Sequence, residues 1–379
     1  MAKAAILGFG TVGSGVAEVL TMNAENIAKT VGEEVQIKYI VDVRDFPDSP
    51  FAPLMTKDFS DVENDPEIDV VAEVIGGATV AYDFTKRALK AGKSVVTSNK
   101  ELVAKHGREL LAIAKDMNVN YLFEASVGGG IPLIRPLTQC LAGNKIEEIY
   151  GILNGTTNYI LTDMIENGAS FEAALREAQR LGYAEANPSA DIDGIDAGRK
   201  ICILADICFG KEVRSDMVPT EGITGVTLED VEAAEKLGYK IKLLGRAMSL
   251  DGKTCAFVAP HLVPKGNMLA RVDGVMNGVV VRGNAVGETM FYGPGAGKLP
   301  TASAVVGDII DALRHRQKRR DIGWEAGESA DFFDPSLLKT PWYVRVEGET
   351  ASITQPCTRA ELNEALAEKT VLASFRVLD

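Results

Sequence analysis

Residues 3–13 read KAAILGFGTVG, and this stretch decides the fold. A short apolar run ends in glycines at positions 8, 10 and 13, and a stretch of helical character follows. In that context Gly8 permits a tight turn, Gly10 lets the backbone approach a pyrophosphate, and Gly13 lets helix and strand pack closely. The helix then offers free N–H groups and a positive dipole end to phosphates. Glycines with this spacing also occur in ordinary turns, but the preceding strand and the following helix favour a dinucleotide site.

Strands and helices go on alternating beyond this turn. Apolar runs predict further strands at residues 35–41, 70–75, 94–97 and 120–124, with helices between them at 79–91 and 101–117. Such alternation is typical of βαβ units around a parallel sheet. The sequence therefore predicts an α/β protein with a doubly wound nucleotide-binding domain over residues 1–134.

The amino-acid composition indicates which kinds of ligand or partner the protein binds. The 379 residues carry 40 Lys and Arg against 53 Asp and Glu, and the net charge of −13 argues against a nucleic-acid or anionic membrane surface. No apolar run is long enough to span a bilayer, and the N-terminus enters a strand with no room for a secretory signal. Five scattered cysteines are typical of reduced thiols, and three distant histidines argue against a His-rich metal site. We expect a cytoplasmic protein that acts on a small molecule.

The choice of dinucleotide depends on the residues after the second strand. Asp42 ends that strand, and an acid there accepts hydrogen bonds from the adenosine ribose and favours NAD. Arg44 follows, and an arginine holds a 2′-phosphate and favours NADP, although it could also be a solvated loop residue. The pattern favours NADP and leaves NAD open.

Two further loops follow strands of the same sheet. Residues 97–100 (TSNK) come at the carboxyl end of the fourth strand, where ligands bind, so Thr97 and Lys100 are expected to face the cofactor. The alternative is that Lys100 is a first-turn helix lysine in water; because the dipole disfavours a lysine there, the position favours a function. Residues 124–132 contain three glycines, and turned-in carbonyls there could hold a hard cation, or the loop could only connect a strand to a helix.

The densest acidic cluster lies in residues 182–200. Gly182 follows a predicted helix and is expected to be its C-terminal glycine, and the loop beyond it holds Glu185 and Asp191. Asp196 and Lys200 are spaced i, i+4 on the next helix, so they share a face. A lysine near a buried helix suits proton transfer, and the acids suit a cationic amino group. The alternative is a surface ion pair worth about 0.3–0.5 kcal/mol.

Taken together, these segments resemble homoserine dehydrogenases. The similarity covers about residues 1–314. The matching pieces are GFGTVG (8–13), TSNK (97–100), FEASVGGGIP (123–132), GILNGTTNYIL (151–161), GYAEANPSADIDGIDAGRK (182–200) and GPGAGKLPTASAVVGDI (293–309).

The resemblance implies NAD(P)H-dependent, reversible reduction of L-aspartate 4-semialdehyde to L-homoserine, in threonine, methionine and isoleucine biosynthesis. It implies a Rossmann-like domain, then an α/β substrate and dimerisation domain with a mixed sheet over residues 135–320. The helix at 298–319 would pack back on the first domain, and the assembly would be a homodimer or homotetramer.

The resemblance also implies roles for individual residues. Lys200 would donate the proton, Asp196 and Lys100 would complete the catalytic set, and Glu185, Asp191 and Asp196 would bind substrate. The cofactor set would be Gly8, Phe9, Gly10, Thr11, Val12, Gly13, Arg44, Thr97, Lys100, Gly182 and Gly297. Backbone oxygens of Glu124, Val127, Gly129 and Ile131 would hold a sodium ion.

The last segment, residues 340–379, matches the family least. It predicts one strand, one helix and one strand after a polar linker, whereas many homoserine dehydrogenases carry a regulatory ACT domain of βαββαβ type. A shortened ACT-like module, an oligomerisation arm and a remnant without ligand all stay open, as does regulation by threonine. Two other functions also stay open: a different amino-acid-pathway dehydrogenase and a nucleotide-binding sensor without turnover.

Overall fold

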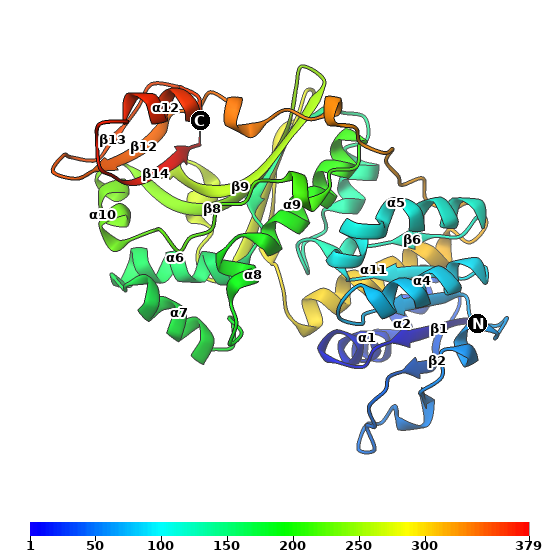
Figure 1. Cartoon of the computed structure of the whole chain (residues 1–379). Helices are drawn as coiled ribbons and strands as arrows, with labels where there is room; N and C mark the ends of the chain where they lie inside the picture. The colour runs from blue at the N-terminus through cyan, green and yellow to red at the C-terminus, as the bar shows by residue number, and fades with distance from the viewer. Residues whose placement is uncertain (379) are drawn as a thin grey trace. The chain divides into compact units, whose positions relative to one another are not determined.

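The computed structural model describes residues 1–378, which divide into two units (Figure 1). Unit 1 comprises Met1–Cys140 and Ala296–Ala326, and unit 2 comprises Leu141–Gly295 and Gly327–Asp379. No helix within residues 1–378 is long and apolar enough to cross a lipid bilayer.

A six-stranded parallel sheet forms the centre of unit 1. The strand order is β3-β2-β1-β4-β5-β6, so the chain starts in the middle and winds outward twice, as predicted. The strands are β1 (Ala2–Leu7), β2 (Val35–Val41), β3 (Met55–Thr56), β4 (Val70–Glu73), β5 (Ser94–Thr97) and β6 (Tyr121–Leu122). The helices are α1 (Thr11–Met22), α2 (Ala24–Val31), α3 (Ser60–Glu63), α4 (Thr79–Lys90), α5 (Lys100–Asp116) and α11 (Lys298–Arg314).

Both faces of this sheet are buried, which explains its nearly continuous apolar strands. Alternate residues of β1, β4 and β5, such as Ile6, Ala72 and Val96, pack with α1, α2 and α11 in one core. Helices α4 and α5 pack against β4, β5 and β6. Helix α11 comes from far along the chain and lies on α1, where a Cβ on Gly15 would stand 2.9 Å from the Lys298 carbonyl oxygen.

Unit 2 is built on an eight-stranded mixed sheet, which confirms the predicted fold class. Its order is β11-β10-β7-β8-β9-β14-β12-β13, and the β9–β14 pair is parallel while the other pairs with recorded register are antiparallel. The strands are β7 (Ile146–Ile152), β8 (Tyr239–Leu250), β9 (Lys253–Pro264), β10 (Met276–Gly283), β11 (Gly287–Pro294), β12 (Trp342–Val346), β13 (Ser352–Ile353) and β14 (Val371–Val377). Asp251 (φ 49°) and Gly252 (φ 81°) make the tight turn between β8 and β9.

The helices of unit 2 are α6 (Gly155–Asn167), α7 (Phe171–Arg180), α8 (Ser189–Ile192), α9 (Ile195–Phe209), α10 (Leu228–Lys236) and α12 (Arg359–Ala365). Helix α9 packs on β7, β8 and β9. Its contact with β8 is close, because a Cβ on Gly245 would stand 3.3 Å from the Cβ of Ile201.

The C-terminal segment belongs to the unit 2 sheet. Strand β14 lies between β9 and β12, and Arg345 on β12 binds the fully buried Asp230 of α10 at 2.6 Å. Tyr343 donates a hydrogen bond of 3.0 Å to the same carboxylate. Residues 340–379, expected as a separate tail, thus share a sheet with unit 2, because the pairing of β14 with β9 is a long-range contact without a local signal. The helix expected at 298–319 lies in unit 1, with the expected first domain.

Candidate active site

The glycine turn of unit 1 has the geometry that its spacing predicts. Gly8 has φ +94°, and a Cβ on Gly13 would fall 1.9 Å from the Gly8 carbonyl oxygen, so only glycine fits there. Helix α1 begins after Gly10 with no side-chain cap and no acid in its first turn. No side chain therefore occupies the first-turn amides, and they could bind an anion such as a pyrophosphate. These residues fit a dinucleotide.

The end of β2 holds an acid already paired with a base. Asp42 accepts a hydrogen bond from the Phe9 backbone at 2.7 Å, and Arg44 donates to it through Nε at 3.0 Å and Nη2 at 2.9 Å. The Arg44 guanidinium holds the pKa of the Asp42 carboxyl well below its usual range, and the backbone amides of Arg44 and Phe9 add to this effect. Arg44 and Lys57 both line a hollow of about 460 Å³ beside this pair. The sequence reading did not single out Lys57.

The carboxyl end of β5 places the predicted residues at the ligand-binding edge of the sheet. Thr97 is buried, and its hydroxyl donates to the Glu73 carboxylate at 2.6 Å. Asn99 caps α5 by accepting from the Leu102 amide at 3.0 Å, and Lys100 is the first residue of that helix. The sequence reading missed Glu73, which looks like an ordinary strand residue at the end of VVAE.

The loop after β6 is closed by its own first residue. The Glu124 carboxylate accepts backbone hydrogen bonds from Leu133, Ile134 and Arg135 at 2.5, 2.8 and 2.7 Å. Gly128 and Gly129 have φ +77° and +55°, so the backbone between these anchors curls tightly. Within residues 1–378 no group of three or more His, Cys, Asp or Glu side chains is arranged to hold a metal. A cation in this loop would depend on carbonyl oxygens.

A buried ion pair forms the centre of the polar cluster in unit 2. The Lys200 ammonium donates to Asp196 Oδ2 at 2.7 Å and to the Leu153 carbonyl at 2.7 Å. The two side chains are only 11% and 8% exposed. The alternative of a solvated surface pair is therefore wrong.

Asn154 links two of the predicted acids. Its Nδ2 donates to Asp191 Oδ1 at 2.7 Å and to Asp196 Oδ2 at 2.8 Å. Its Oδ1 accepts from the Thr157 amide at 2.8 Å, which caps α6. One amide thus fixes two carboxylates beside Lys200. From the sequence alone, the Asn and Thr residues at this point could either cap the next helix or line a site.

Asn158, in the same polar segment as Asn154, has structural partners. Asn158 donates to the carbonyls of Val272 and Gly274 at 3.0 Å each and accepts from the buried Lys242 at 3.0 Å. Burial lowers the pKa of Lys242. Asn158 therefore braces the loop before β10.

The remaining predicted residues have simpler surroundings. Gly182 is left-handed at φ +77° and ends the α7 region, as a C-terminal glycine does. Glu185 is exposed in the loop that follows, and its carbonyl accepts from the Gln179 side chain at 3.1 Å. Gly297, at φ +124°, stands at the start of α11.

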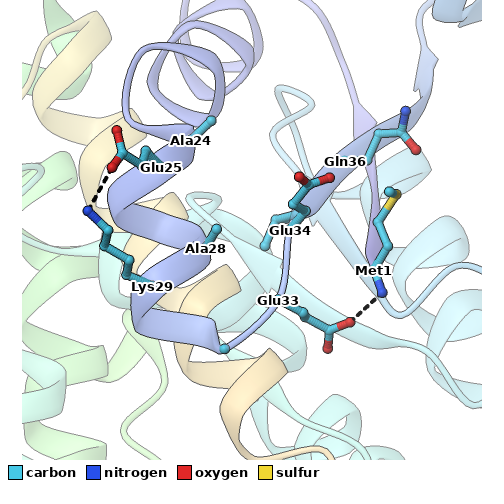
Figure 2. A pocket seen from close by; sticks show the side chains of 10 residues that line it. Met1, Ala24, Glu25, Ala28, Lys29, Glu33, Glu34 and Gln36 are labelled. Atoms are coloured by element: carbon cyan, nitrogen blue, oxygen red, sulfur yellow. Dashed lines mark hydrogen bonds and ion pairs between the residues drawn. The ribbon is translucent and has the colours of Figure 1, made fainter.

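Another hollow on unit 1 has a volume of about 720 Å³. Figure 2 shows the residues that line it. It lies between α2 and the amino ends of β1 and β2, and the ion pairs Met1–Glu33 and Lys29–Glu25 stand at its wall. Because ligands of open parallel sheets bind at the carboxyl ends of the strands, this hollow is not the candidate site.

A doubly wound sheet with a pyrophosphate turn, in a chain that also buries an ammonium against a carboxylate, defines a nicotinamide-dependent dehydrogenase. Comparison with known proteins gives the family. Residues 132–310 match the family model for homoserine dehydrogenase, and residues 8–124 match the model for the homoserine dehydrogenase NAD-binding domain.

Whole-chain similarity agrees. Homoserine dehydrogenase of Pseudomonas aeruginosa is 47% identical over 82% of this chain and 72% of its own, and that of Neisseria gonorrhoeae is 40% identical over 97% and 85%. The crystal structure of a homoserine dehydrogenase from Thiobacillus denitrificans is 37% identical with a TM-score of 0.90, covering 100% of this chain and 98% of that one. A hyperthermophilic archaeal homoserine dehydrogenase in complex with NADPH is 30% identical with a TM-score of 0.68, covering 82% and 97%.

The chain belongs to the homoserine dehydrogenase family, which confirms the resemblance seen in its sequence. It is an NAD(P)-dependent oxidoreductase that interconverts L-aspartate 4-semialdehyde and L-homoserine.

Proposed function

We propose that Lys200 is the proton donor of this reaction, that Asp196 and Lys100 complete the catalytic set, and that the enzyme serves cytoplasmic threonine, methionine and isoleucine biosynthesis. The observation that carries the proposal is the buried pair of Lys200 and Asp196, joined through Asn154 to Asp191. Burying an ammonium costs free energy, and Asp196 offsets that cost here. A charged pair kept away from water in this way favours a chemical role over that of an exposed surface pair.

The chemistry follows from where charge develops. When bound, the nicotinamide cofactor supplies the hydride that reduces the aldehyde carbon. Negative charge then grows on the aldehyde oxygen, and an ammonium within hydrogen-bond reach stabilises that charge and delivers a proton. The Asp196 carboxylate at 2.7 Å favours the charged form of Lys200, and the Leu153 carbonyl at 2.7 Å fixes the direction of its Nζ.

The acids beside Lys200 suit the amino group of the substrate. We assign Glu185, Asp191 and Asp196 to it, because carboxylates hold an ammonium by charge-assisted hydrogen bonds. Asp191 and Asp196 would repel each other without a shared donor, and Asn154 is that donor. Binding at this end of the substrate orients the aldehyde.

The cofactor assignment rests on unit 1. The backbone of Gly8, Phe9, Gly10, Thr11, Val12 and Gly13 would hold the pyrophosphate. Arg44 and Lys57 would hold a 2′-phosphate, which supports NADP as the preferred cofactor with NAD as the alternative. Thr97 and Lys100 stand at the same edge of the sheet, and Gly182 and Gly297 complete the proposed cofactor set.

We propose a sodium ion in the loop after β6, bound by the backbone oxygens of Glu124, Val127, Gly129 and Ile131. The tight curl of this loop and its closure by the Glu124 carboxylate support a carbonyl cage. Replacing sodium by a large organic cation in the buffer should lower activity, and unchanged activity would contradict the site.

We also propose a homodimer or a homotetramer, formed through unit 2. The wide mixed sheet, with β11 and β13 at its edges, is a suitable layer for such an interface. Light scattering of the purified chain tests this, and a monomer at micromolar concentration would contradict it.

An analogue without the amino group tests the substrate assignment. We expect kcat/KM for aspartate semialdehyde to exceed that for succinic semialdehyde by at least ~100-fold, since the acids would lose their partner. Glu185→Gln and Asp191→Asn should each reduce that preference by about tenfold. Asp193→Asn, an exposed acid of the same loop, is the matched control and should behave as wild type. Equal rates on both aldehydes in the wild type would contradict the proposal.

A further inference from the structure

The carboxyl end of β4 carries an acid to which neither the fold nor the proposed chemistry assigns a role. Glu73 is fully buried at the last position of that strand. Its Oε1 accepts from the Ile75 amide at 2.7 Å, and its Oε2 accepts from the Thr97 hydroxyl at 2.6 Å. The carboxylate therefore joins the end of β4 to the end of β5.

The same carboxylate holds two loops together. The Thr97 hydroxyl accepts from the Asn99 amide at 2.9 Å, and the Asn99 side chain donates to the carbonyls of Ile75 and Gly77 at 3.0 and 2.7 Å. Asn99 also caps α5, where Lys100 begins the helix. Loss of the Glu73 contacts would leave the Asn99 side chain as the remaining link between the loop after β4 and the start of α5.

These loops border the glycine turn. A Cβ on Gly8 would stand 3.1 Å from the Val74 carbonyl oxygen and 3.2 Å from Ile75 Cγ1, and one on Gly13 would stand 3.3 Å from Val74 Cγ2. The backbone after Glu73 is thus in direct contact with the turn that would hold the pyrophosphate. A shift of Val74 and Ile75 would change the shape of that turn.

The environment of Glu73 makes its charge sensitive to pH. Burial raises its pKa to about 7, against the opposing effect of hydrogen bonds from Thr97, Ile75 and Asn99. The titratable group that faces it is Tyr121 on β6, whose own pKa is raised by burial and by the Glu73 charge. Thr97 and Asn99 are uncharged, and the buried residues of α4 and α5 are uncharged as well.

We propose that Glu73 is a positioning residue for the cofactor, whose ionised form holds both loops in the binding geometry, so that cofactor affinity falls when Glu73 takes up a proton. A protonated carboxyl must turn one oxygen from acceptor to donor, and Thr97 Oγ1, which already accepts from Asn99, would then have to rotate its own hydrogen away. This inference rests on the proposed assignment of the glycine turn to the cofactor.

The test is direct binding of NADH to the full chain, followed by its fluorescence between about pH 5.5 and 8.5. NADH lacks the 2′-phosphate, so titration of that group does not enter. We expect the wild-type Kd to be about tenfold higher at the acid end, as for loss of one charge-assisted hydrogen bond. Glu73→Gln should bind with a Kd that no longer depends on pH and is close to the weak wild-type value.

Two further variants separate positioning from folding. Thr97→Val removes a donor that stabilises the carboxylate, so its pH transition should move to higher pH. Tyr121→Phe removes a buried hydroxyl without a hydrogen-bond partner among the described residues, and it should keep the wild-type profile. If Glu73→Gln fails to fold, the Thr97→Val shift carries the test.

A wild-type Kd that does not change with pH would overturn the inference, as would a Glu73→Gln variant with the wild-type profile. Neither result would contradict the assignment of the glycine turn to the cofactor. A wild-type chain that does not bind NADH or NADPH at any pH would overturn both.

Discussion

Replacing Lys200 with methionine should damage activity and stability to different extents, and the structure allows both to be worked out. Methionine keeps much of the volume and removes the charge. Breaking a buried ion pair by removing one partner costs ~3–5 kcal/mol. Asp196 keeps its hydrogen bond from Asn154, so we expect a loss at the lower end, about 3 kcal/mol in the free energy of unfolding. Loss of a general acid should lower kcat by about 10²–10⁴-fold.

A double variant distinguishes the two effects. Lys200→Met with Asp196→Asn removes both charges, so no uncompensated carboxylate stays buried, and about half of the lost stability should return. Activity should not return, because no proton donor is restored. Arg199→Met, which removes a less buried cation from the preceding position of α9, is the matched control and should keep activity and stability near wild type.

The measurements are urea unfolding for stability, and oxidation of NADPH by aspartate semialdehyde, read from the absorbance of the reduced nicotinamide, for activity. NADPH binding to Lys200→Met, measured by fluorescence, should match the wild type because Lys200 is not among the residues proposed to hold the cofactor. Turnover by Lys200→Met within about threefold of wild type would refute the assignment of the proton donor.

Three further results are expected. Arg44→Ser should raise KM for NADPH by about tenfold or more and leave KM for NADH unchanged or lower, and an equal effect on both cofactors would argue against a 2′-phosphate site. Gly13→Ala should abolish NADPH binding in a fluorescence titration, because its Cβ would fall 1.9 Å from the Gly8 carbonyl oxygen; Gly323→Ala, whose Cβ meets nothing within 4 Å, should bind normally. Because burial raises the Glu73 pKa from 4.5 to about 7, wild type should lose up to about 3 kcal/mol of stability relative to Glu73→Gln as the pH rises through this interval. Urea unfolding at both ends of the interval measures that difference, and a constant difference would contradict the raised pKa.

Much of unit 1 follows from its sequence because its signals are local. The apolar runs at residues 35–41 and 94–97 coincide with β2 and β5, and the turn at Gly8 needs only neighbouring residues. Helix α11 packs on α1 although most of unit 2 separates them in the chain, a contact that its sequence periodicity alone does not specify.

The interactions that the sequence reading missed are long-range. Strand β14 joins β9 as a parallel neighbour, and helix α10 is fixed by Asp230, which binds Arg345 from a distant strand. Glu73 gains its role from Thr97 on a neighbouring strand, and nothing in its local sequence marks it. Asn154 stands in a polar cluster, but its contact with Asp191 is long-range and is not specified by that cluster. By contrast, Asp196 and Lys200 share one helical turn, and their spacing indicated their contact.

Homoserine-dependent reduction of NADP⁺ by the purified chain, with Lys200→Met alongside, tests the central claim most directly. The wild type should form reduced nicotinamide and aspartate semialdehyde in equal amounts, only when homoserine is present, and Lys200→Met should form almost none while still binding the nucleotide. A wild-type chain that binds NADPH but shows no homoserine-dependent reduction of NADP⁺ or NAD⁺ would contradict the account.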